Sequence, residues 1–127
     1  VGLPRSGKST WARSMGFPIV NRDAIRLAIH GERYLQKAEP WVDTITHTLV
    51  EALFLAGHKD VILDECNVTA KRRERWMNEK WNTRFVSIPT PKAVCMRRAR
   101  DQGDYVLLPV IEDMAKKFEE IKGRRYI

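Results

Sequence analysis

The sequence predicts a three-layer α/β domain, with helices on both faces of a parallel sheet. Short apolar runs alternate with segments whose apolar residues keep helical spacing, and this alternation is typical of strand–helix–strand units with right-handed crossovers. The 127 residues, of which 43% are hydrophobic, suffice for one compact core but not for two. We therefore expect a single domain over residues 1–127, with a small lid at about 97–110.

Three apolar runs are short enough to be buried strands. They occupy residues 17–20, 61–63 and 84–88. The second run ends on Asp64 and Glu65, which predicts a central strand with acids at its carboxyl end. The glycine-rich loop described below would normally follow a strand, yet it begins at residue 2. We therefore expect the first strand to be absent or reduced to Val1, and the sequence to be a fragment of a longer chain.

Helical spacing marks the segments between these runs. The predicted helices cover residues 8–15, 24 onward, 40–56, 69–81, 90–100 and 109–122. Asp23 can cap the second helix, Thr69 can cap the fourth, and Gly123 can stop the last. The stretch 31–39 is polar and irregular, and 101–108 is predicted to be a mobile loop.

The composition favours anionic partners and gives no sign of a membrane-spanning helix. The formal net charge is +7, which suits nucleotides, phosphorylated substrates or nucleic acid without choosing among them. Charged residues interrupt the sequence every few positions, so no stretch approaches the roughly 20 apolar residues of a membrane-spanning helix. No secretory signal is visible. We predict that Cys66 and Cys95 are reduced core thiols and that the protein is cytoplasmic.

The most specific motif lies in the first ten residues. Residues 2–9 read Gly-Leu-Pro-Arg-Ser-Gly-Lys-Ser, which fits G-x-x-x-x-G-K-[ST] in full. Glycines let the backbone N–H groups converge on phosphate oxygens. Lys8 then places an ammonium against the β and γ phosphates, and the Ser9 hydroxyl completes a Mg²⁺ shell. The expected ATP contacts are Pro4, Arg5, Ser6, Gly7, Lys8, Ser9 and Thr10.

This motif predicts a P-loop NTPase, of the type found in nucleoside-triphosphate kinases, with ATP and Mg²⁺ as ligands. The apolar run at 61–63 would deliver Asp64 to the place where Mg²⁺ and the γ phosphate lie. An acid that only caps a turn after a core strand is the alternative. The upstream loop favours Asp64 as the second metal-site residue beside Ser9.

The acceptor side of the sequence favours a small kinase. The chain is too short for a helicase or motor core, and it lacks an Asn-Lys-x-Asp tetrapeptide for reading guanine. Asp23, after the strand at 17–20, can accept a proton from an attacking hydroxyl. Arg26, one helical turn later, can hold an anionic acceptor. A plain helix cap at Asp23 and a surface arginine at Arg26 are the alternatives.

Three arginines precede the predicted loop at 101–108. They are Arg97, Arg98 and Arg100. An arginine on a lid is the usual way to stabilise charge on a transferring phosphoryl group. We favour Arg100 as the catalytic arginine, and Arg97 next as an ATP contact. The alternative is that all three only cover the end of their helix.

Taken in order, these motifs resemble a known family. The residues concerned are Gly-x-Pro-x-Ser-Gly-Lys-Ser-Thr-Trp-Ala-Arg at 2–13, Asn-Arg-Asp-x-x-Arg at 21–26, Asp-x-x-Asn at 64–67, Arg72-Arg73, Trp76 and the lid arginines. This order resembles the 5′-kinase domain of the phage polynucleotide kinase-phosphatases. It is also similar to the wider group of small P-loop kinases of the zeta-toxin-like kind. The resemblance spans nearly the whole chain.

The resemblance implies a role for each matching residue of the loop and of the segment 21–26. Lys8 and Ser9 would hold the triphosphate and Mg²⁺. Asp23 would be the general base on the 5′-hydroxyl. Arg26 would grip the neighbouring phosphate of the acceptor.

The later motifs gain roles in the same way. Asp64 would organise the site, and Arg100 would contact the donor phosphates from the lid, although Arg97 can replace it in this role. Asn67 and Arg72 would lie on the acceptor side. The family step from acid to asparagine is Asp-x-Asn, and this chain has one residue more between Asp64 and Asn67.

Three functions stay open at this point. The leading prediction is an ATP-dependent kinase for a polynucleotide 5′-hydroxyl, which the charge of +7 favours modestly. A kinase for a small metabolite, nucleotide or antibiotic is the second, and a non-catalytic ATP-binding module is the third. The expected partners are ATP and either a nucleic-acid 5′ end or a small anionic acceptor. Tyr34 and Tyr105 are available for base stacking, whereas Trp41 is predicted to be a core residue.

Overall fold

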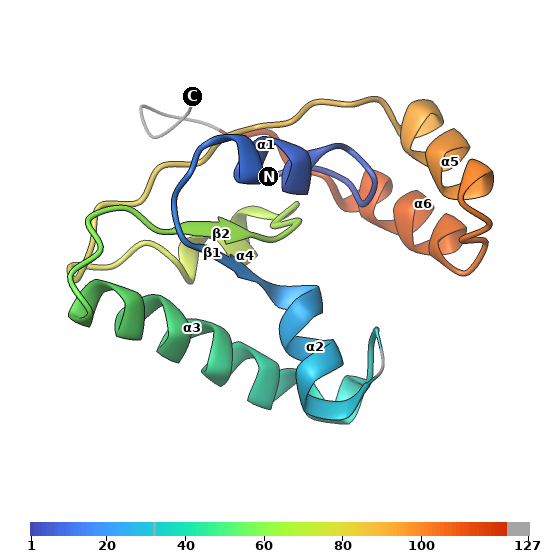
Figure 1. Ribbon diagram of the computed structural model, residues 1–127. Helices are drawn as coiled ribbons and strands as arrows, with labels where there is room; N and C mark the ends of the chain where they lie inside the picture. The colour runs from blue at the N-terminus through green and yellow to red at the C-terminus, as the bar shows by residue number, and fades with distance from the viewer. Residues whose placement is uncertain (32, 122–127) are drawn as a thin grey trace. The chain divides into compact units, whose positions relative to one another are not determined.

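The computed structural model describes residues 1–31 and 33–121, which form a mixed α/β fold (Figure 1). Its elements are α1 (Lys8–Ser14), β1 (Ile19–Asn21), α2 (Arg22–His30), the 3₁₀ helix η1 (Gln36–Ala38), α3 (Glu39–Leu55), β2 (Ile62–Asp64), α4 (Ala70–Glu74), α5 (Lys92–Asp101) and α6 (Leu107–Lys117). The chain divides into two compact units. We call Ser9–Glu65 the strand unit, and Val1–Lys8 together with Cys66–Ile127 the loop unit.

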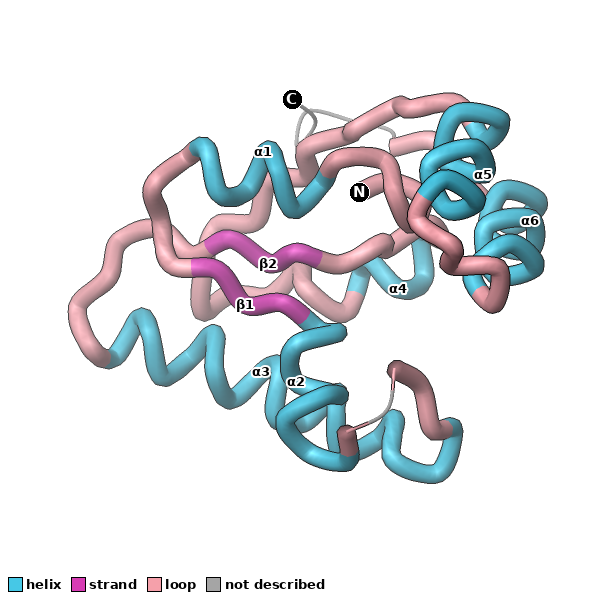
Figure 2. The backbone as a smooth tube through the Cα atoms, turned by 45° about the vertical axis from the view of Figure 1, so that its right-hand side comes forward, coloured by secondary structure: helices cyan, strands magenta, loops and turns pink. Residues whose placement is uncertain are grey.

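The strand unit contains a parallel pair of strands. β1 pairs with β2 in the register Ile19 to Ile62, Val20 to Leu63 and Asn21 to Asp64. Figure 2 shows the two strands side by side, with α3 along one side of the pair and α1 on the other. The predicted parallel pairing is confirmed on this small scale. The wider three-layer sheet stays a prediction, because only two strands occur in residues 1–31 and 33–121.

The start of α2 differs from the prediction. The helix begins at Arg22, and its N-cap is Asn21, whose side-chain Oδ1 accepts a hydrogen bond from the Ala24 amide at 2.8 Å. Asn21 can do this because its extended backbone, at the end of β1, leaves the side chain beside the first helical turn. The prediction that Asp23 caps this helix is therefore wrong. Asp23 lies in the first turn of α2 instead.

α3 is the longest helix of the strand unit, and its buried row is Val42, Thr46 and Val50. Thr46 is fully buried, and this polar side chain is tolerated there because its hydroxyl donates to the Val42 carbonyl at 2.6 Å. Trp41 belongs to the adjacent row and is 68% exposed, so its prediction as a core residue is wrong. The helix is rotated by about one residue from the position that would bury Trp41.

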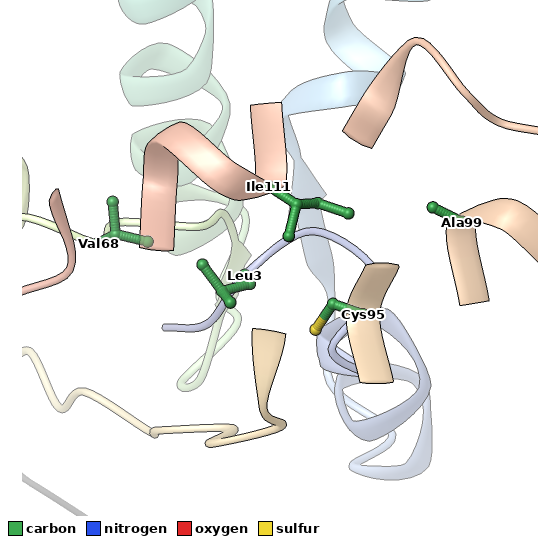
Figure 3. Packing of buried hydrophobic residues seen from close by; sticks show 5 residues of the cluster. All are labelled: Leu3, Val68, Cys95, Ala99 and Ile111. Atoms are coloured by element: carbon green, nitrogen blue, oxygen red, sulfur yellow. The ribbon is translucent and has the colours of Figure 1, made fainter. Parts of the chain in front are cut away.

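The loop unit has its core where α5 and α6 pack together (Figures 1 and 2). The buried cluster consists of Leu3, Val68, Cys95, Ala99 and Ile111 (Figure 3). Leu3 belongs to the glycine-rich loop, and the figure shows it between Val68 and Cys95. This cluster ties the loop to the two helices, and both cysteines, the buried Cys95 and the half-buried Cys66, are reduced thiols.

The turn between α5 and α6 is shorter than the predicted loop. α5 extends to Asp101 and α6 begins at Leu107, so the predicted loop at 101–108 shrinks to a turn of residues 102–106. Two backbone bonds, from Gly103 to the Arg100 carbonyl and from Asp104 to the Ala99 carbonyl, tighten that turn. α6 ends at Lys117 rather than at 122. The predicted stop at Gly123 lies outside the described residues.

The segment between α4 and α5 also departs from the prediction. Thr69 caps α4 as predicted, by accepting a hydrogen bond from the Arg72 amide at 3.3 Å, but the helix ends at Glu74 instead of 81. The chain then curls round Trp76, whose carbonyl accepts hydrogen bonds from Trp81 Nε1 and the Thr83 hydroxyl. These two bonds take the place of the backbone hydrogen bond that the Trp76 carbonyl would accept if the helix continued.

The predicted strand at 84–88 is not a strand. Its backbone instead bonds to the start of the chain, since the Val1 amine donates to the Val86 carbonyl at 2.7 Å and Ile88 N donates to the Val1 carbonyl at 2.8 Å. Gly2 N donates to the Cys66 carbonyl at 3.1 Å. Val1 and Gly2 thus form backbone hydrogen bonds of the kind that a strand forms with its neighbours. No helix of the part that the structure describes is long and apolar enough to cross a membrane.

Candidate nucleotide-binding site

The glycine-rich loop at residues 2–7 runs directly into α1. Arg5 and Gly7 adopt left-handed conformations, with φ of 65° and 101°. Ser6 N donates to the Leu3 carbonyl at 3.1 Å, which closes a turn between them. Left-handed residues within a tight loop are typical of the anion-binding backbone that the motif predicts. We call residues 2–7 the phosphate loop.

Gly2 is required by a close approach of two backbones. A Cβ at Gly2 would lie 2.8 Å from the Ile88 carbonyl oxygen and 2.8 Å from Ser6 Oγ. The carbonyl belongs to the backbone and cannot rotate away. The first glycine of the motif therefore has a steric reason in this chain.

Lys8 is folded over the phosphate loop. Its Nζ donates to the Leu3 carbonyl at 2.7 Å, and Leu3 is itself fixed in the core of the loop unit. The ammonium thus lies on the loop predicted to bind phosphate. An ammonium has three N–H donors, so Lys8 can donate to a phosphate oxygen as well as to the Leu3 carbonyl.

Two side chains hold the loop's carbonyls. Thr90 Oγ1 donates to the Ser6 carbonyl at 2.7 Å, and Arg98 Nη1 donates to the Arg5 carbonyl at 3.0 Å. Sequence reasoning missed Thr90, whose local signal is the Thr-Pro step at the start of the helix predicted over 90–100. A third contact joins Arg5 Nη2 to Asp104 Oδ2 at 3.0 Å.

Of the three lid arginines, the structure therefore brings Arg98 to the phosphate loop. Arg97 and Arg100 are exposed on α5, and no hydrogen bond from either to the loop occurs in the described residues. Their predicted roles at ATP stay predictions. Helical geometry explains the difference, since Arg98 lies on the face of α5 next to buried Cys95 and Ala99.

The strand unit contains the predicted metal pair. Ser9 Oγ donates to Asp64 Oδ2 at 2.6 Å, and Asp64 is 7% exposed. Asn21 Nδ2 donates to the same oxygen at 2.8 Å. Asn21 thus caps α2 with one atom and orients Asp64 with the other, because the sheet register sets the two residues side by side.

Ser9 and Asp64 fit Mg²⁺ by their chemistry. A hydroxyl and a carboxylate are hard oxygen ligands, and Mg²⁺ is usually held by one or two protein oxygens together with water and substrate phosphates. Throughout residues 1–31 and 33–121, no group of three or more His, Cys, Asp or Glu side chains could hold a metal ion by itself. A magnesium ion would therefore depend on the nucleotide for most of its ligands.

Asp23 and Arg26, the predicted base and acceptor residue, are brought together on α2. Arg26 Nη1 donates to Asp23 Oδ1 at 2.8 Å. Arg26 also pairs with Glu39, through Nε at 3.0 Å and Nη2 at 2.6 Å, and its guanidinium carbon lies 5.8 Å from the Tyr34 ring centre. The side chain of Asp23 is 67% exposed, and that of Arg26 is 16% exposed. Sequence reasoning missed Glu39, which no local pattern connects to Arg26.

Arg22 is a buried cation that sequence reasoning also missed. It is 5% exposed and contacts Glu65 at 3.0 Å, Glu39 at 3.4 Å and Asp43. Burial by itself would lower the pKa of the Arg22 guanidinium, but the three carboxylates outweigh it and raise that pKa above its ordinary value. Arg22 thereby holds Glu65, the residue after Asp64, and the start of α3 in one network.

Asn67 and Arg72, the remaining predicted acceptor residues, lie in the loop unit. Asn67 is buried, with φ of 46°, and its carbonyl accepts a hydrogen bond from Arg73 Nη1 at 2.9 Å. Arg73 also donates to the Glu119 carbonyl at 2.9 Å, so this arginine ties chain segments together. Arg72 is only half-buried. The structure places Arg73, not Arg72, against Asn67.

The phosphate loop, the hydroxyl–carboxylate pair and the parallel strands define a P-loop nucleotide-binding domain. A family model described as "AAA domain" matches residues 1–121. The chain belongs to this family, which is P-loop NTPase-like and includes kinases.

Proposed function

We propose that the chain is a Mg²⁺-dependent phosphotransferase that moves the γ-phosphoryl group of ATP to a hydroxyl acceptor. The supporting observation is the position of two carboxylates within the strand unit. Asp64 ends β2, Asp23 follows the end of β1 by two residues, and Asn21 beside Asp64 fixes the register between them. A module that only binds ATP needs the first carboxylate but has no use for the second.

The donor would be held by consecutive residues. The N–H groups of the phosphate loop and Lys8 would bind the β and γ phosphates, and Ser9 follows Lys8 directly on α1. Ser9 and Asp64 would hold Mg²⁺, which when bound offsets the phosphate charge and aligns the γ phosphate. Lys8 would donate its remaining N–H groups to phosphate oxygens.

Asp23 would act as the general base. It would accept the proton of the acceptor hydroxyl while that oxygen bonds to the γ phosphorus and the bond to the bridging oxygen of ADP breaks. The exposed carboxylate is open to an acceptor, and Arg26 orients it from one helical turn away. Arg100, or Arg97, would offset the charge on the equatorial oxygens from the lid at about 97–110.

A polynucleotide 5′-hydroxyl is the first candidate acceptor. The charge of +7 attracts a polyanion, and Arg26 with the Tyr34 ring offers a cation and a stacking surface close together. Asn67 and Arg72 would also contact the acceptor. The three-layer sheet and a cytoplasmic location likewise remain predictions.

A small, uncharged hydroxyl compound is the second candidate. One observation favours it: Arg26 already pairs with the carboxylates of Asp23 and Glu39. Two carboxylates exceed the charge of one guanidinium, so an acceptor phosphate would have to displace Glu39 to reach it. An uncharged sugar or nucleoside would meet no such competition.

The test is to supply ATP labelled in the γ phosphate to the protein with 5′-hydroxyl oligonucleotides, nucleosides and sugars. Label should appear in one of these classes, and Lys8→Ala should abolish transfer while Lys59→Ala, which removes an exposed lysine, should not. The affinity for an oligonucleotide that contacts about 3 phosphates should fall with log[salt] at a slope near −2, and that for an uncharged acceptor should barely change. Mg²⁺-dependent ATP binding without label in any acceptor would refute the transferase.

A further inference from the structure

Arg5 has a conformation that its residue type disfavours. In the described part of the chain, only Arg5 and Asn67 have a positive φ without being glycine. A left-handed residue with a Cβ is crowded by the following carbonyl, whereas glycine adopts this conformation freely. Arg5 lies in the middle of the phosphate loop. The turn closed by Ser6 N and the Leu3 carbonyl requires a left-handed residue at this position, and contacts from outside the loop must offset the strain of Arg5.

Two contacts within the loop unit do so. The Arg5 guanidinium pairs with Asp104, 3.0 Å away, and the side chain of Asp104 is only 12% exposed. The Arg5 carbonyl accepts a hydrogen bond from Arg98 at 3.0 Å. Side chain and backbone of Arg5 are thus both held by α5 and by the turn that follows it.

The holding structure is itself firmly packed. The Asp104 amide donates to the Ala99 carbonyl at 2.8 Å, which fixes the turn to the end of α5. Ala99 and Ile111 are fully buried where α5 meets α6. A displacement of Asp104 would therefore require the helix pair to move.

These contacts bear on phosphate binding because a trans peptide points its C=O and its N–H in opposite directions. Arg98 holds the Arg5 carbonyl, and Thr90 holds the Ser6 carbonyl. The Ser6 N–H donates to the Leu3 carbonyl within the turn, and the N–H of Gly7 is directed away from the Ser6 carbonyl that Thr90 holds. The direction of the Gly7 N–H, set by the shape of this turn, then bears on whether the loop can bind an anion.

We propose that Arg5 is a positioning residue of the phosphate loop, and that Asp104 and Arg98 stabilise its left-handed conformation so that ATP affinity depends on the turn between α5 and α6. This inference rests on ATP binding at the loop, as in the proposed function. Arg5 acts through the shape of the loop, since its guanidinium is engaged by Asp104.

The test is a double-mutant cycle with Mg²⁺-ATP affinity measured by calorimetry. The variants are Asp104→Asn, Arg5→Gly and the two combined. Asp113→Asn is the matched control, because it removes an exposed carboxylate of α6 that pairs with Lys117 one turn away. The thermal unfolding midpoint of each variant shows whether it folds. If Asp104→Asn does not fold, Arg98→Met takes its place in the cycle.

Asp104→Asn should weaken ATP binding about tenfold, because it removes one restraint on a strained residue. Arg5→Gly should bind within about threefold of the wild type, since glycine needs no restraint. In the Arg5→Gly background, Asp104→Asn should change affinity by less than about twofold. Asp113→Asn should have no effect.

An equal loss from Asp104→Asn in both backgrounds would show that Asp104 acts on something other than Arg5. A gain in affinity would show that Asp104 keeps Arg5 away from the phosphates. Either result overturns this inference but leaves the transferase standing. A wild-type protein that binds no Mg²⁺-ATP overturns both.

Discussion

The hydroxyl of Ser9 donates a 2.6 Å hydrogen bond to Asp64 Oδ2, and so joins α1 to the carboxyl end of β2. Asn21 donates to the same oxygen, which leaves Asp64 held by two donors in a nearly buried position. Mg²⁺ would compete with the Ser9 proton for that carboxylate. In the proposed function, the pair would thus be preorganised for Mg²⁺ before the nucleotide binds.

Asp64→Asn should therefore weaken ATP binding about tenfold or more in the presence of Mg²⁺, because the amide has no charge to hold the ion. ATP binding in excess chelator should change by less than about twofold. Calorimetry with and without Mg²⁺ measures both. Asp60→Asn, an exposed residue shortly before β2, is the control. Equal losses with and without Mg²⁺ would assign Asp64 a structural role only.

Asp23→Asn tests the proposed base. The rate of γ-phosphoryl transfer should fall by about 10²-fold or more, because the amide cannot accept the hydroxyl proton. The Kd for Mg²⁺-ATP should stay within about twofold, since Asp23 is not a donor contact in the proposed site. Single-turnover transfer and calorimetry separate the two quantities. An unchanged transfer rate would remove Asp23 from the mechanism.

Arg26→Gln separates the two acceptor classes. If Arg26 contacts a phosphate of a polynucleotide, its loss should make the salt dependence of acceptor affinity shallower by about 0.7 in log–log slope. The slope should be unaffected by Arg13→Gln, which removes an exposed arginine of α1. If the acceptor is uncharged, neither variant should alter the slope. A shallower slope with Arg13→Gln alone would place the polynucleotide elsewhere on the strand unit.

Local sequence signals predicted the elements whose causes are local. The phosphate loop, α1 and the Thr69 cap depend on residues within a few positions of each other, and all three form as predicted. The pair of Ser9 and Asp64 was predictable too, because the motif that ends on Ser9 and the apolar run that precedes Asp64 both mark metal-site residues. These features carry the candidate site.

Contacts between distant residues were not predictable in this way. Arg22 is buried because three carboxylates from other elements surround it, and no pattern near Arg22 announces them. On α3, the rows containing Trp41 and Val42 are both largely apolar, so periodicity could not decide which row is buried. Asn21 and Thr90 look like ordinary junction residues until their distant partners are known.

Gly2→Ala should damage the loop through sterics alone. The added Cβ would lie 2.8 Å from the Ile88 carbonyl, so the backbone of one segment must move. We expect a loss of about 1–3 kcal/mol in the free energy of unfolding, as for other overpacked sites, and weaker ATP binding. Urea unfolding and calorimetry measure these effects. Normal stability and affinity would mean that the loop can shift away from Ile88 at no cost.

Cys95 gives a prediction about pH. Burial raises the pKa of its thiol above the ordinary value, although the nearby charges of Arg98 and Lys8 oppose the rise. The folded state therefore retains the thiol proton more tightly than the unfolded state. The contribution of Cys95 to stability is fully present below the unfolded pKa and is lost as the pH rises through the folded pKa.

Cys95→Ala should remove that pH dependence. At pH 8 the variant should be about 1 kcal/mol less stable than the wild type, because it loses packing in the core of the loop unit. The difference should shrink as the pH rises above about 9, since only the wild type must keep a buried thiol from ionising. Urea unfolding at pH 8, 9 and 10 measures it. A difference that stays constant over this range would mean that the Cys95 thiol ionises as easily in the folded state as in the unfolded chain.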